Sequence, residues 1–401
     1  MSADNRSDLT SVMLVTPLWG RDGGVAAHVQ ASAAALVDHG LDVHVLTARI
    51  DSAERVPRVT LHHRPELLSS RAPVEVRLGE EYLLLKPLVS HLHQLDDQGV
   101  VEAIQRTSPV VISAHGYPGC TSGVYYFAPG QECSRSHGPG CIPNLMARGC
   151  AHTRHPRTLP KKYWKVTRGL AAIGCADLAV SYSSAVDRHL AVNGLSRRAV
   201  VPYFPTMPLK EGADHTAARR VVFAGRLERP KGVEVLIRAA CEVDGEFVVC
   251  GEGRELQAMR RLAQRLGIES RIRFAGWLDP DELATELADA SVVVVPSLWP
   301  EPFGIVGIEA LASGRPTVAS ATGGIVDWLE DGVGGLRVAP GDARALARAL
   351  NELLADPQRR RTMGVAGRRL VAERFSRERH VQVLMEAYGT ARSTWEAGRR
   401  A

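Results

Sequence analysis

Two glutamates, Glu301 and Glu309, stand where an all-valine strand, residues 292–295, gives way to a predicted helix. Glu301 precedes that helix and Glu309 lies about two turns inside it. Ligands of open α/β sheets bind beyond the carboxyl ends of parallel strands. Two acids so placed can bracket a sugar nucleotide, with Glu301 near the sugar and Glu309 on the ribose hydroxyls. Taken singly, each has a plainer interpretation, as an acid that complements the helix dipole or a solvated surface residue.

The beginning of the same helix offers a place for an anion. The amides of Gly304, Ile305 and Val306 have no acceptor within a helix, and the helix dipole favours negative charge at this end. A diphosphate bound there would leave the sugar and the ribose of one ligand within reach of the two acids. The segment therefore predicts a site for a nucleoside-diphosphate sugar.

Other nucleotide chemistries are disfavoured by their motifs. No Gly-x-x-x-x-Gly-Lys-Ser/Thr sequence is present, which argues against a phosphate-cleaving P-loop enzyme. Gly251-x-Gly253 lacks the third glycine of the dinucleotide fingerprint, which argues against a dehydrogenase. Asp279-Pro280-Asp281 has the Asp-x-Asp spacing of a metal site. However, an acid before a proline at the first helical position predicts a helix cap instead.

The elements that must position this site occur twice. An apolar strand, a glycine loop, a helix and a second strand span residues 12–47, and the same order recurs over residues 221–250. This predicts an α/β fold with two Rossmann-like domains, each a doubly wound parallel sheet. We expect an amino-terminal domain over residues 1–208 and a carboxy-terminal domain over residues 209–375. Either domain could receive the final helix, residues 376–401, including a return onto the first.

The composition is that of a folded chain without a bulk sign of nucleic-acid binding. Of 401 residues 45% are hydrophobic, and 49 basic against 44 acidic residues give a net charge of +5. The longest apolar runs are too short for a membrane-spanning helix, and the first residues do not resemble a secretory signal. We therefore expect a cytoplasmic protein. Seven cysteines, an odd number, predict reduced thiols rather than a disulfide framework.

Together, motifs along nearly the whole chain resemble family 4 of the retaining glycosyltransferases, which have the two-domain GT-B fold. They are Gly23-Gly24, residues 113–116, residues 177–181, Gly225-Arg226-Leu227, Lys231-Gly232, residues 296–314 with their Glu-x7-Glu spacing, Gly323-Gly324 and Phe375-Ser376. The resemblance implies two domains that face each other across a cleft. The second would hold the nucleotide sugar and the first the acceptor.

The resemblance also implies roles for single residues. Those assigned to the donor diphosphate and ribose are Gly24, Arg226, Lys231 and Glu309, which would act beside the Ile305 and Val306 amides of the helix N-terminus. Those assigned to the sugar and the transferring centre are His115, Glu301, Phe303 and Gly304. Two cations and a helix N-terminus can offset the charge of a diphosphate, so we expect neither a cofactor nor a catalytic metal. Lys231 could instead merely precede a helix, and His115 could be a structural histidine.

The implied reaction is transfer of a hexose from a nucleotide sugar, UDP-sugar favoured, to an acceptor hydroxyl by a same-face mechanism with retention. The acceptor would be a small molecule, a glycolipid or a polysaccharide. Within the same fold, the alternative is a sugar-nucleotide epimerase or hydrolase, and from another class a catalytically silent binding protein. Asp327 stands where the family usually has a glutamate after its late glycine pair.

One segment, residues 115–168, departs from the general family pattern and resembles a cysteine-bearing subset of bacterial members. Its four cysteines, with histidines between them, lack a Cys-x2-Cys pair, so free thiols are favoured over zinc or a redox role. These cysteines are Cys120, Cys133, Cys141 and Cys150. The basic stretch that follows includes Lys161, Lys162 and Lys165 and contains no acid. We expect it to contact an anionic acceptor or the headgroups of a membrane surface, with a solvated face as the alternative.

Overall fold

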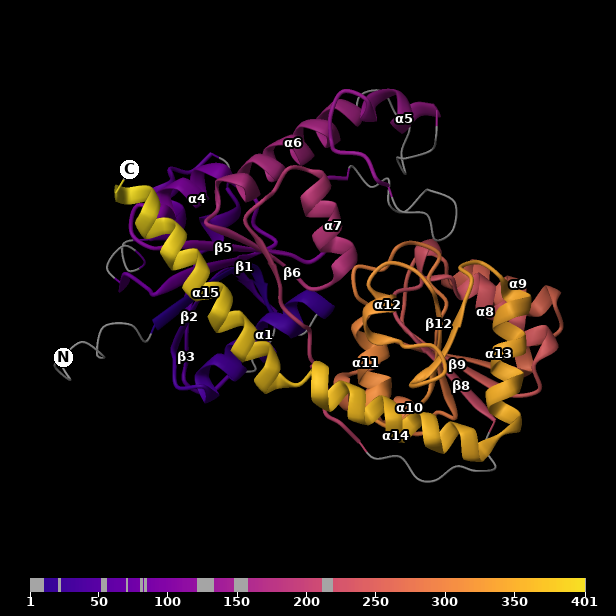
Figure 1. Cartoon of the computed structure of the whole chain (residues 1–401). Coiled ribbons are helices and arrows are strands. Elements are labelled where there is room, and N and C mark those ends of the chain that lie inside the picture. Colours follow the sequence, from indigo (N-terminus) through magenta and orange to yellow (C-terminus); the bar gives the residue numbers. More distant parts are fainter. Residues whose placement is uncertain are drawn as a thin grey trace.

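The computed structural model describes residues 11–20, 23–51, 56–69, 71–79, 82, 85–120, 133–147, 158–210 and 219–400. Within these ranges the strands form two parallel sheets, one of seven strands and one of six. Figure 1 shows the sheets in two domains side by side. They are joined by the linker, of which residues 201–210 are described, and by the long helices near the carboxyl end. The α/β fold of two Rossmann-like domains predicted from the sequence is confirmed.

The amino-terminal sheet has the order β3-β2-β1-β4-β5-β6-β7. Its strands are β1 (Ser11–Trp19), β2 (Asp42–Ile50), β3 (Val59–His63), β4 (Val89–His93), β5 (Val110–Ala114), β6 (Leu178–Ser181) and β7 (Arg198–Val200). The order reverses between β1 and β4, which is where sheets of this kind bind ligands. β4 and β5 are buried along their whole length, as expected for central parallel strands.

The helices of this domain follow the strands as crossover connections. They are α1 (Gly24–Asp38), the 3-10 turn η2 (Pro65–Leu68), α2 (Val74–Leu78), α4 (Gln98–Gln105), α5 (Cys141–Ala147), α6 (Leu159–Cys175) and α7 (Ser184–Val192). Asp97 and Ser183 cap α4 and α7 with their side chains. Figure 1 shows α5 and the beginning of α6 extending beyond the sheet, on the side toward the other domain.

The carboxy-terminal sheet has the equivalent order β10-β9-β8-β11-β12-β13. Its strands are β8 (Arg220–Ala224), β9 (Glu246–Cys250), β10 (Ile272–Gly276), β11 (Val292–Val295), β12 (Thr317–Ser320) and β13 (Gly335–Val338). The order reverses between β8 and β11. The loops after these two strands contain Arg226, Lys231 and Glu301, so the fold brings the predicted donor residues to the switch point.

Helices cover the second sheet and then lead back to the first. They are α8 (Val233–Ala239), α9 (Leu256–Arg265), α10 (Pro280–Ala288), α11 (Ile305–Ala312), α12 (Ile325–Trp328), α13 (Ala343–Ala355), α14 (Pro357–Arg374) and α15 (Arg377–Arg400). Short 3-10 turns occur at Arg229–Lys231 (η4), Ala240–Glu242 (η5) and Glu269–Arg271 (η6). Asp279 caps α10 by accepting from the Glu282 amide, and the Glu282 carboxylate accepts from the Asp279 amide. The predicted helix cap at the Asp-x-Asp sequence is thus confirmed.

The last helix, α15, lies on the amino-terminal domain (Figure 1). It contacts α1, β4, β5 and β6 and buries Val381, Leu384 and Tyr388 against them. The Tyr388 hydroxyl is 2.9 Å from Nδ1 of His91 in β4. The chain therefore crosses between the domains twice, once through the linker after β7 and once at the junction of α14 and α15.

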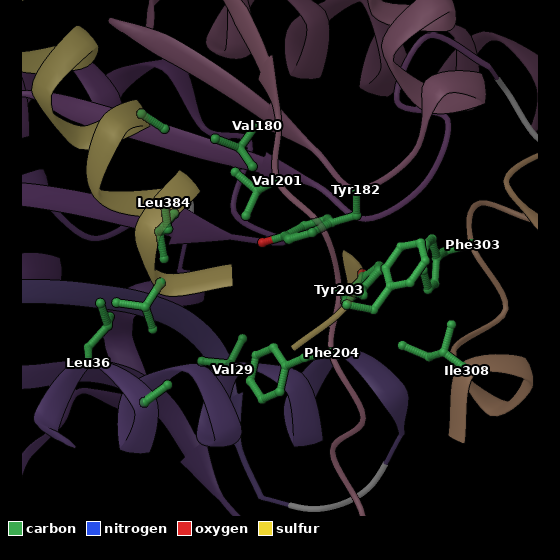
Figure 2. Packing of buried hydrophobic residues seen from close by; sticks show 14 of the residues in the cluster. Val29, Leu36, Val180, Tyr182, Val201, Tyr203, Phe204, Phe303, Ile308 and Leu384 are labelled. Atoms are coloured by element: carbon green, nitrogen blue, oxygen red, sulfur yellow. The ribbon is translucent and has the colours of Figure 1, made fainter. Parts of the chain in front are cut away.

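A single apolar cluster runs from one domain into the other through the linker. It includes Val29 and Leu36 of α1 and also Ile308 of α11. Figure 2 shows that successive linker residues point to opposite sides, with Phe204 toward α1 and Tyr203 toward Phe303 of the second domain. Because these aromatic rings are buried, relative movement of the domains has to repack this cluster.

Candidate active site

The loops after β8 and β11 pack directly on each other. Gly232 has φ +71°, and a Cβ at this position would lie 1.9 Å from the Pro296 carbonyl oxygen. The Leu298 amide donates to the Pro230 carbonyl at 2.8 Å. Only glycine allows this approach, which explains the Lys-Gly pair. The contact places Lys231 beside the segment that contains Glu301.

Lys231 and Glu301 form an ion pair at this junction. Lys231 Nζ lies 2.6 Å from Oε1 of Glu301, and the two side chains are 22% and 6% exposed. The other carboxylate oxygen, Oε2, accepts hydrogen bonds of 2.9 Å from the Ser297 hydroxyl and the Trp299 indole N–H. Glu301 is therefore held in one orientation. An anion that reaches Lys231 would compete with this carboxylate for the ammonium group.

The beginning of α11 has the geometry of an anion site, although one predicted side chain lies elsewhere. Gly304 is the N-cap residue in the left-handed conformation, with φ +85°, and Ile305 and Val306 are partly exposed after it. Phe303, by contrast, is 3% exposed, and its ring packs 4.9 Å from Tyr203. The side chain of Phe303 thus faces the linker rather than open space, and the backbone around Gly304 remains for a ligand.

Gly323 and Gly324 pack against the loop that contains Glu301. A Cβ at Gly323, where φ is +57°, would lie 2.4 Å from the Glu301 amide nitrogen. The Gly324 amide donates to the Glu301 carbonyl at 2.6 Å. The backbone of Glu301 is therefore fixed as firmly as its side chain.

Glu309 has a different partner from the ribose that the resemblance implies. It is 4% exposed, and its Oε1 accepts from the amide and the hydroxyl of Thr206 in the linker, at 3.3 and 3.1 Å. Burial raises the pKa of this carboxyl to about 7, although the hydrogen bonds from Thr206 and Met207 act in the opposite direction. Contact with ribose stays a prediction, and it would require Glu309 to exchange these donors.

His115, at the end of β5, has both ring nitrogens hydrogen-bonded. Nε2 lies 3.0 Å from Nδ1 of His93, and Nδ1 lies 2.8 Å from the Tyr203 hydroxyl. Its ring stacks on Tyr182 with centroids 4.8 Å apart. Burial lowers the pKa of His115 to about 3, so the imidazole is neutral near pH 7. A sugar could bind a nitrogen of His115 only by replacing His93 or Tyr203.

The remaining predicted residues occupy positions of differing exposure. Gly24 begins α1 with no atom within 4 Å of the place a Cβ would take, which leaves room for a ligand. Arg226 is exposed directly after β8. Lys161 and Lys165 are exposed on α6, whereas Lys162 is partly buried on another side of this helix.

Two contacts that the sequence did not predict join the domains beside the site. The Asp327 carboxylate of α12 accepts from the Ser184 amide at 2.7 Å and from the Ser184 hydroxyl at 2.6 Å. Ser184 is the first residue of α7, so the carboxylate caps a helix of the other domain. Tyr117, after β5, contacts Trp299 with ring centroids 6.3 Å apart. The two domains thus meet close to Glu301.

The cysteine-rich segment is only partly described. Cys120, Cys133 and Cys141 are thiols there, and Cys150 lies outside the described residues. His137 Nε2 lies 2.9 Å from the Thr167 hydroxyl of α6. Among the residues with described positions, no three His, Cys, Asp or Glu side chains gather as metal ligands. Over the same residues, no helix is both long and apolar enough to cross a membrane. The role of the cysteines stays a prediction.

Comparison with known proteins gives the same assignment for the second domain. Residues 210–370 match the family model for glycosyl transferases group 1. The carboxy-terminal domain is thus similar to this family over those residues. A D-inositol 3-phosphate glycosyltransferase of Salinispora tropica is 39% identical over 185 residues, which are 43% of this chain and 38% of that protein. The lipopolysaccharide core biosynthesis glycosyltransferase LpsE of Rhizobium meliloti is 36% identical over 159 residues, 39% of this chain and 46% of LpsE. The matched region thus spans less than half of these relatives.

Solved structures extend the likeness to the whole fold. Sucrose-phosphate synthase from Thermosynechococcus elongatus superposes with a TM-score of 0.71 at 22% identity, over 94% of this chain and 98% of that one. Anabaena Alr3699/HepE in complex with UDP-glucose gives 0.67 at 17% identity, over 95% and 99% of the two chains. With two parallel sheets of the same order, these matches show the GT-B fold. The group 1 family model ends at residue 370, before α15 of this GT-B protein.

Proposed function

We propose that the protein transfers a sugar from a nucleoside-diphosphate sugar to an acceptor hydroxyl with retention of configuration. The observation that carries this proposal is the Lys231–Glu301 pair, fixed beside the N-terminus of α11 at the switch point of the second sheet. A cation, a buried carboxylate and a helix N-terminus there match a diphosphate joined to a sugar. UDP-sugar is the favoured donor, and the structural relative that binds UDP-glucose supports this choice.

In the proposed reaction the bond between the anomeric carbon and the diphosphate oxygen breaks, and the acceptor oxygen bonds to that carbon on the same face. The acceptor proton passes to the departing diphosphate. Lys231, Arg226 and the α11 amides stabilise the negative charge on the leaving group. Once Lys231 turns to the diphosphate, Glu301 loses one donor, and its Oε1 becomes available to a sugar hydroxyl.

Removing one cation at a time tests the diphosphate site. We expect Lys231→Ala and Arg226→Ala each to weaken UDP binding about tenfold or more, because a hydrogen bond to a charged group contributes about 1.5–3 kcal/mol. Arg229→Ala is the matched control, since Arg229 is exposed in the same loop. Calorimetric titration with UDP, GDP and dTDP measures all three variants. Equal affinities in Lys231→Ala, Arg226→Ala and the wild type would refute the site.

Product analysis separates the proposal from its alternatives. A transferase forms a glycoside only when an acceptor is present, an epimerase or hydrolase changes the donor without one, and a binding protein leaves the donor intact. Full activity in EDTA is expected if the two cations and the helix suffice. Activity that returns only with Mg²⁺ or Mn²⁺ would show that the proposed site is incomplete.

We further propose that the acceptor carries an anionic group that α6 contacts. Four residues of α6 are exposed at helical spacing and form one stripe, namely Lys161, Trp164, Lys165 and Arg168. The Trp164 side chain is 59% exposed in the middle of this stripe. Cations around an exposed indole suit a phosphorylated acceptor, free or as a lipid headgroup. The inositol-phosphate relative supports such an acceptor.

A charge-removing variant tests the α6 stripe. Replacing Lys161, Lys165 and Arg168 by Ala should raise the acceptor KM several-fold and abolish its salt dependence, with slow donor hydrolysis unchanged. The control removes three exposed cations from the other domain, Arg265, Arg344 and Arg348. Sedimentation with vesicles containing anionic lipid distinguishes a headgroup from a free phosphate. An unaltered acceptor KM together with unaltered vesicle binding would leave a solvated helix face.

A further inference from the structure

Tyr203 of the linker contacts both halves of the proposed site. Its hydroxyl is 2.8 Å from Nδ1 of His115, at the end of β5 in the first domain. Its ring lies 4.9 Å from Phe303, the residue before the N-cap of α11 in the second domain. The same ring stacks on Tyr182 at 4.2 Å. Figure 2 shows Tyr203 between Tyr182 and Phe303 where the linker passes from one domain to the other.

The protonation of the three groups can be worked out from their burial. Burial holds the pKa of His115 near 3 and that of His93 well below its ordinary value, so both imidazoles are neutral. Burial also raises the pKa of Tyr203 well above 10, so the phenol keeps its proton. Each neutral imidazole has one N–H and one acceptor nitrogen. Only two arrangements of the hydrogen bonds Tyr203–His115–His93 satisfy these limits.

Relative acidity chooses between the two arrangements. A phenol is a stronger hydrogen-bond donor than a neutral imidazole N–H, and an imidazole nitrogen is the better acceptor. Tyr203 therefore donates to Nδ1 of His115. His115 in turn donates its Nε2–H to Nδ1 of His93, 3.0 Å away. His28 and Tyr182 also face the His115 ring, and burial keeps the former neutral and the latter protonated.

We propose that Tyr203 is a positioning residue that fixes His115 as the Nε2–H tautomer and links this orientation to the donor loop through Phe303. This inference rests on the proposed function, in which His115 lies by the donor sugar. In this tautomer Nε2 carries the N–H of the His115 ring, so it is the nitrogen that can donate to a sugar oxygen. The His115 Nε2–H then donates to a sugar oxygen, which takes the place of His93 Nδ1 as the acceptor. The linker contact thus determines which hydrogen bond the sugar receives.

A hydroxyl deletion tests this role. In Tyr203→Phe, we expect a kcat about five- to tenfold lower, the donor KM within twofold of wild type and a nearly unchanged Tm. Tyr182→Phe is the matched control, because it removes a hydroxyl from the neighbouring ring. That hydroxyl is bonded to Ser113 at 2.6 Å instead of to His115. The control should keep wild-type kcat.

Nitrogen-15 NMR reads the tautomer directly and does not depend on activity. In the wild type, His115 should show a protonated Nε2 and an unprotonated Nδ1, and Tyr203→Phe should move both shifts toward the average of two tautomers. A protonated Nδ1 in the wild type, or shifts that Tyr203→Phe leaves unaltered, would overturn the inference. If the wild type binds no nucleoside diphosphate, the proposed function fails instead, and the NMR result still decides the tautomer.

Discussion

The two glutamates of the candidate site differ in what surrounds their carboxylates. Glu301 is buried among a lysine, a hydroxyl and an indole N–H, all of which donate to it. Glu309 is equally buried and accepts only from the neutral donors of the linker, and its burial raises its pKa to about 7.

Glu309 makes stability depend on pH near neutrality. Its pKa is about 7 in the folded chain against 4.5 as the ordinary value, so the folded state binds more protons between these limits. The contribution of Glu309 to the free energy of unfolding is therefore complete below about pH 4.5. It falls by up to about 3 kcal/mol as the pH rises past 7. Glu309→Gln should be about 2 kcal/mol more stable than wild type at pH 8.5 and nearly equal at pH 5.

Denaturant unfolding at the two pH values measures this difference. Glu242→Gln, a substitution of an exposed acid in the same domain, provides the control and should show no such change. If the difference in stability between Glu309→Gln and the wild type is the same at pH 5 and pH 8.5, burial does not raise the pKa of Glu309.

Residues of the candidate site could be predicted from the sequence where each belongs to a motif within its own loop. Lys231 and Glu301 were assigned to one site in this way, and the structure places them in contact. The partners Thr206 and His93 were missed because each comes from a different part of the chain. Nothing local to either residue indicates its contact. Only the fold brings them to Glu309 and His115.

At the scale of elements, the valine run of residues 292–295 and the glycine loops were sufficient to predict several strands and helices of the second domain. β4 was missed because its sequence, Val-Ser-His-Leu-His, has too few apolar residues to indicate a buried strand. Both ring nitrogens of His91 in this strand find partners on other elements, Ser113 and Tyr388. α15 could be predicted as a helix, but its return to the first domain follows from tertiary packing alone.

The contact between α12 and α7 consists of the hydrogen bonds from Ser184 to the Asp327 carboxylate, and a substitution can remove it. Asp327→Ala removes both hydrogen bonds to Ser184 and should weaken the contact between the domains by about 2 kcal/mol. We therefore expect amide exchange in the first turn of α7 to quicken at least tenfold. Hydrogen exchange with mass spectrometry measures this turn, and small-angle scattering reports any wider separation of the domains.

Glu330→Ala serves as the control, since Glu330 is an exposed acid three residues further on. Unchanged exchange at Ser184 in Asp327→Ala would mean that α7 is held by packing, such as the close approach of Gly324 to Ser183, and not by the carboxylate.

Across the described part of the molecule, histidines from four elements meet in the first domain, four of them buried and His115 partly buried. They are His28 of α1, His91 and His93 of β4, His115 after β5 and His380 of α15. Burial lowers the pKa of each, to about 3 for His91 and His115 and to about 4 for His380. The ordinary value is 6.5, so the unfolded chain takes up more protons below it. Stability is therefore complete above about pH 6.5 and is lost as the pH falls toward 4.

Thermal unfolding between pH 7 and pH 4.5 should show this loss as a slope of stability against pH. In His380→Gln, this slope should correspond to up to one fewer proton taken up on unfolding. His39→Gln, which alters an exposed histidine, should leave the slope unchanged. An equal slope in wild type and His380→Gln would exclude His380 as a source of acid lability. Since Glu309 acts in the opposite direction, the two effects together place the stability maximum near neutral pH.

Because α15 packs on the first domain, the contacts of that domain are complete only after the second domain has been synthesised. The ribosome releases the strands of the first sheet early, yet Tyr388 and His380 emerge only after the whole second domain. Until then, His91 and Ser32 lack partners that they have in the finished protein. The nascent amino-terminal half thus remains an incomplete unit on which chaperones can act. The second domain, with all its strands already released, can fold first.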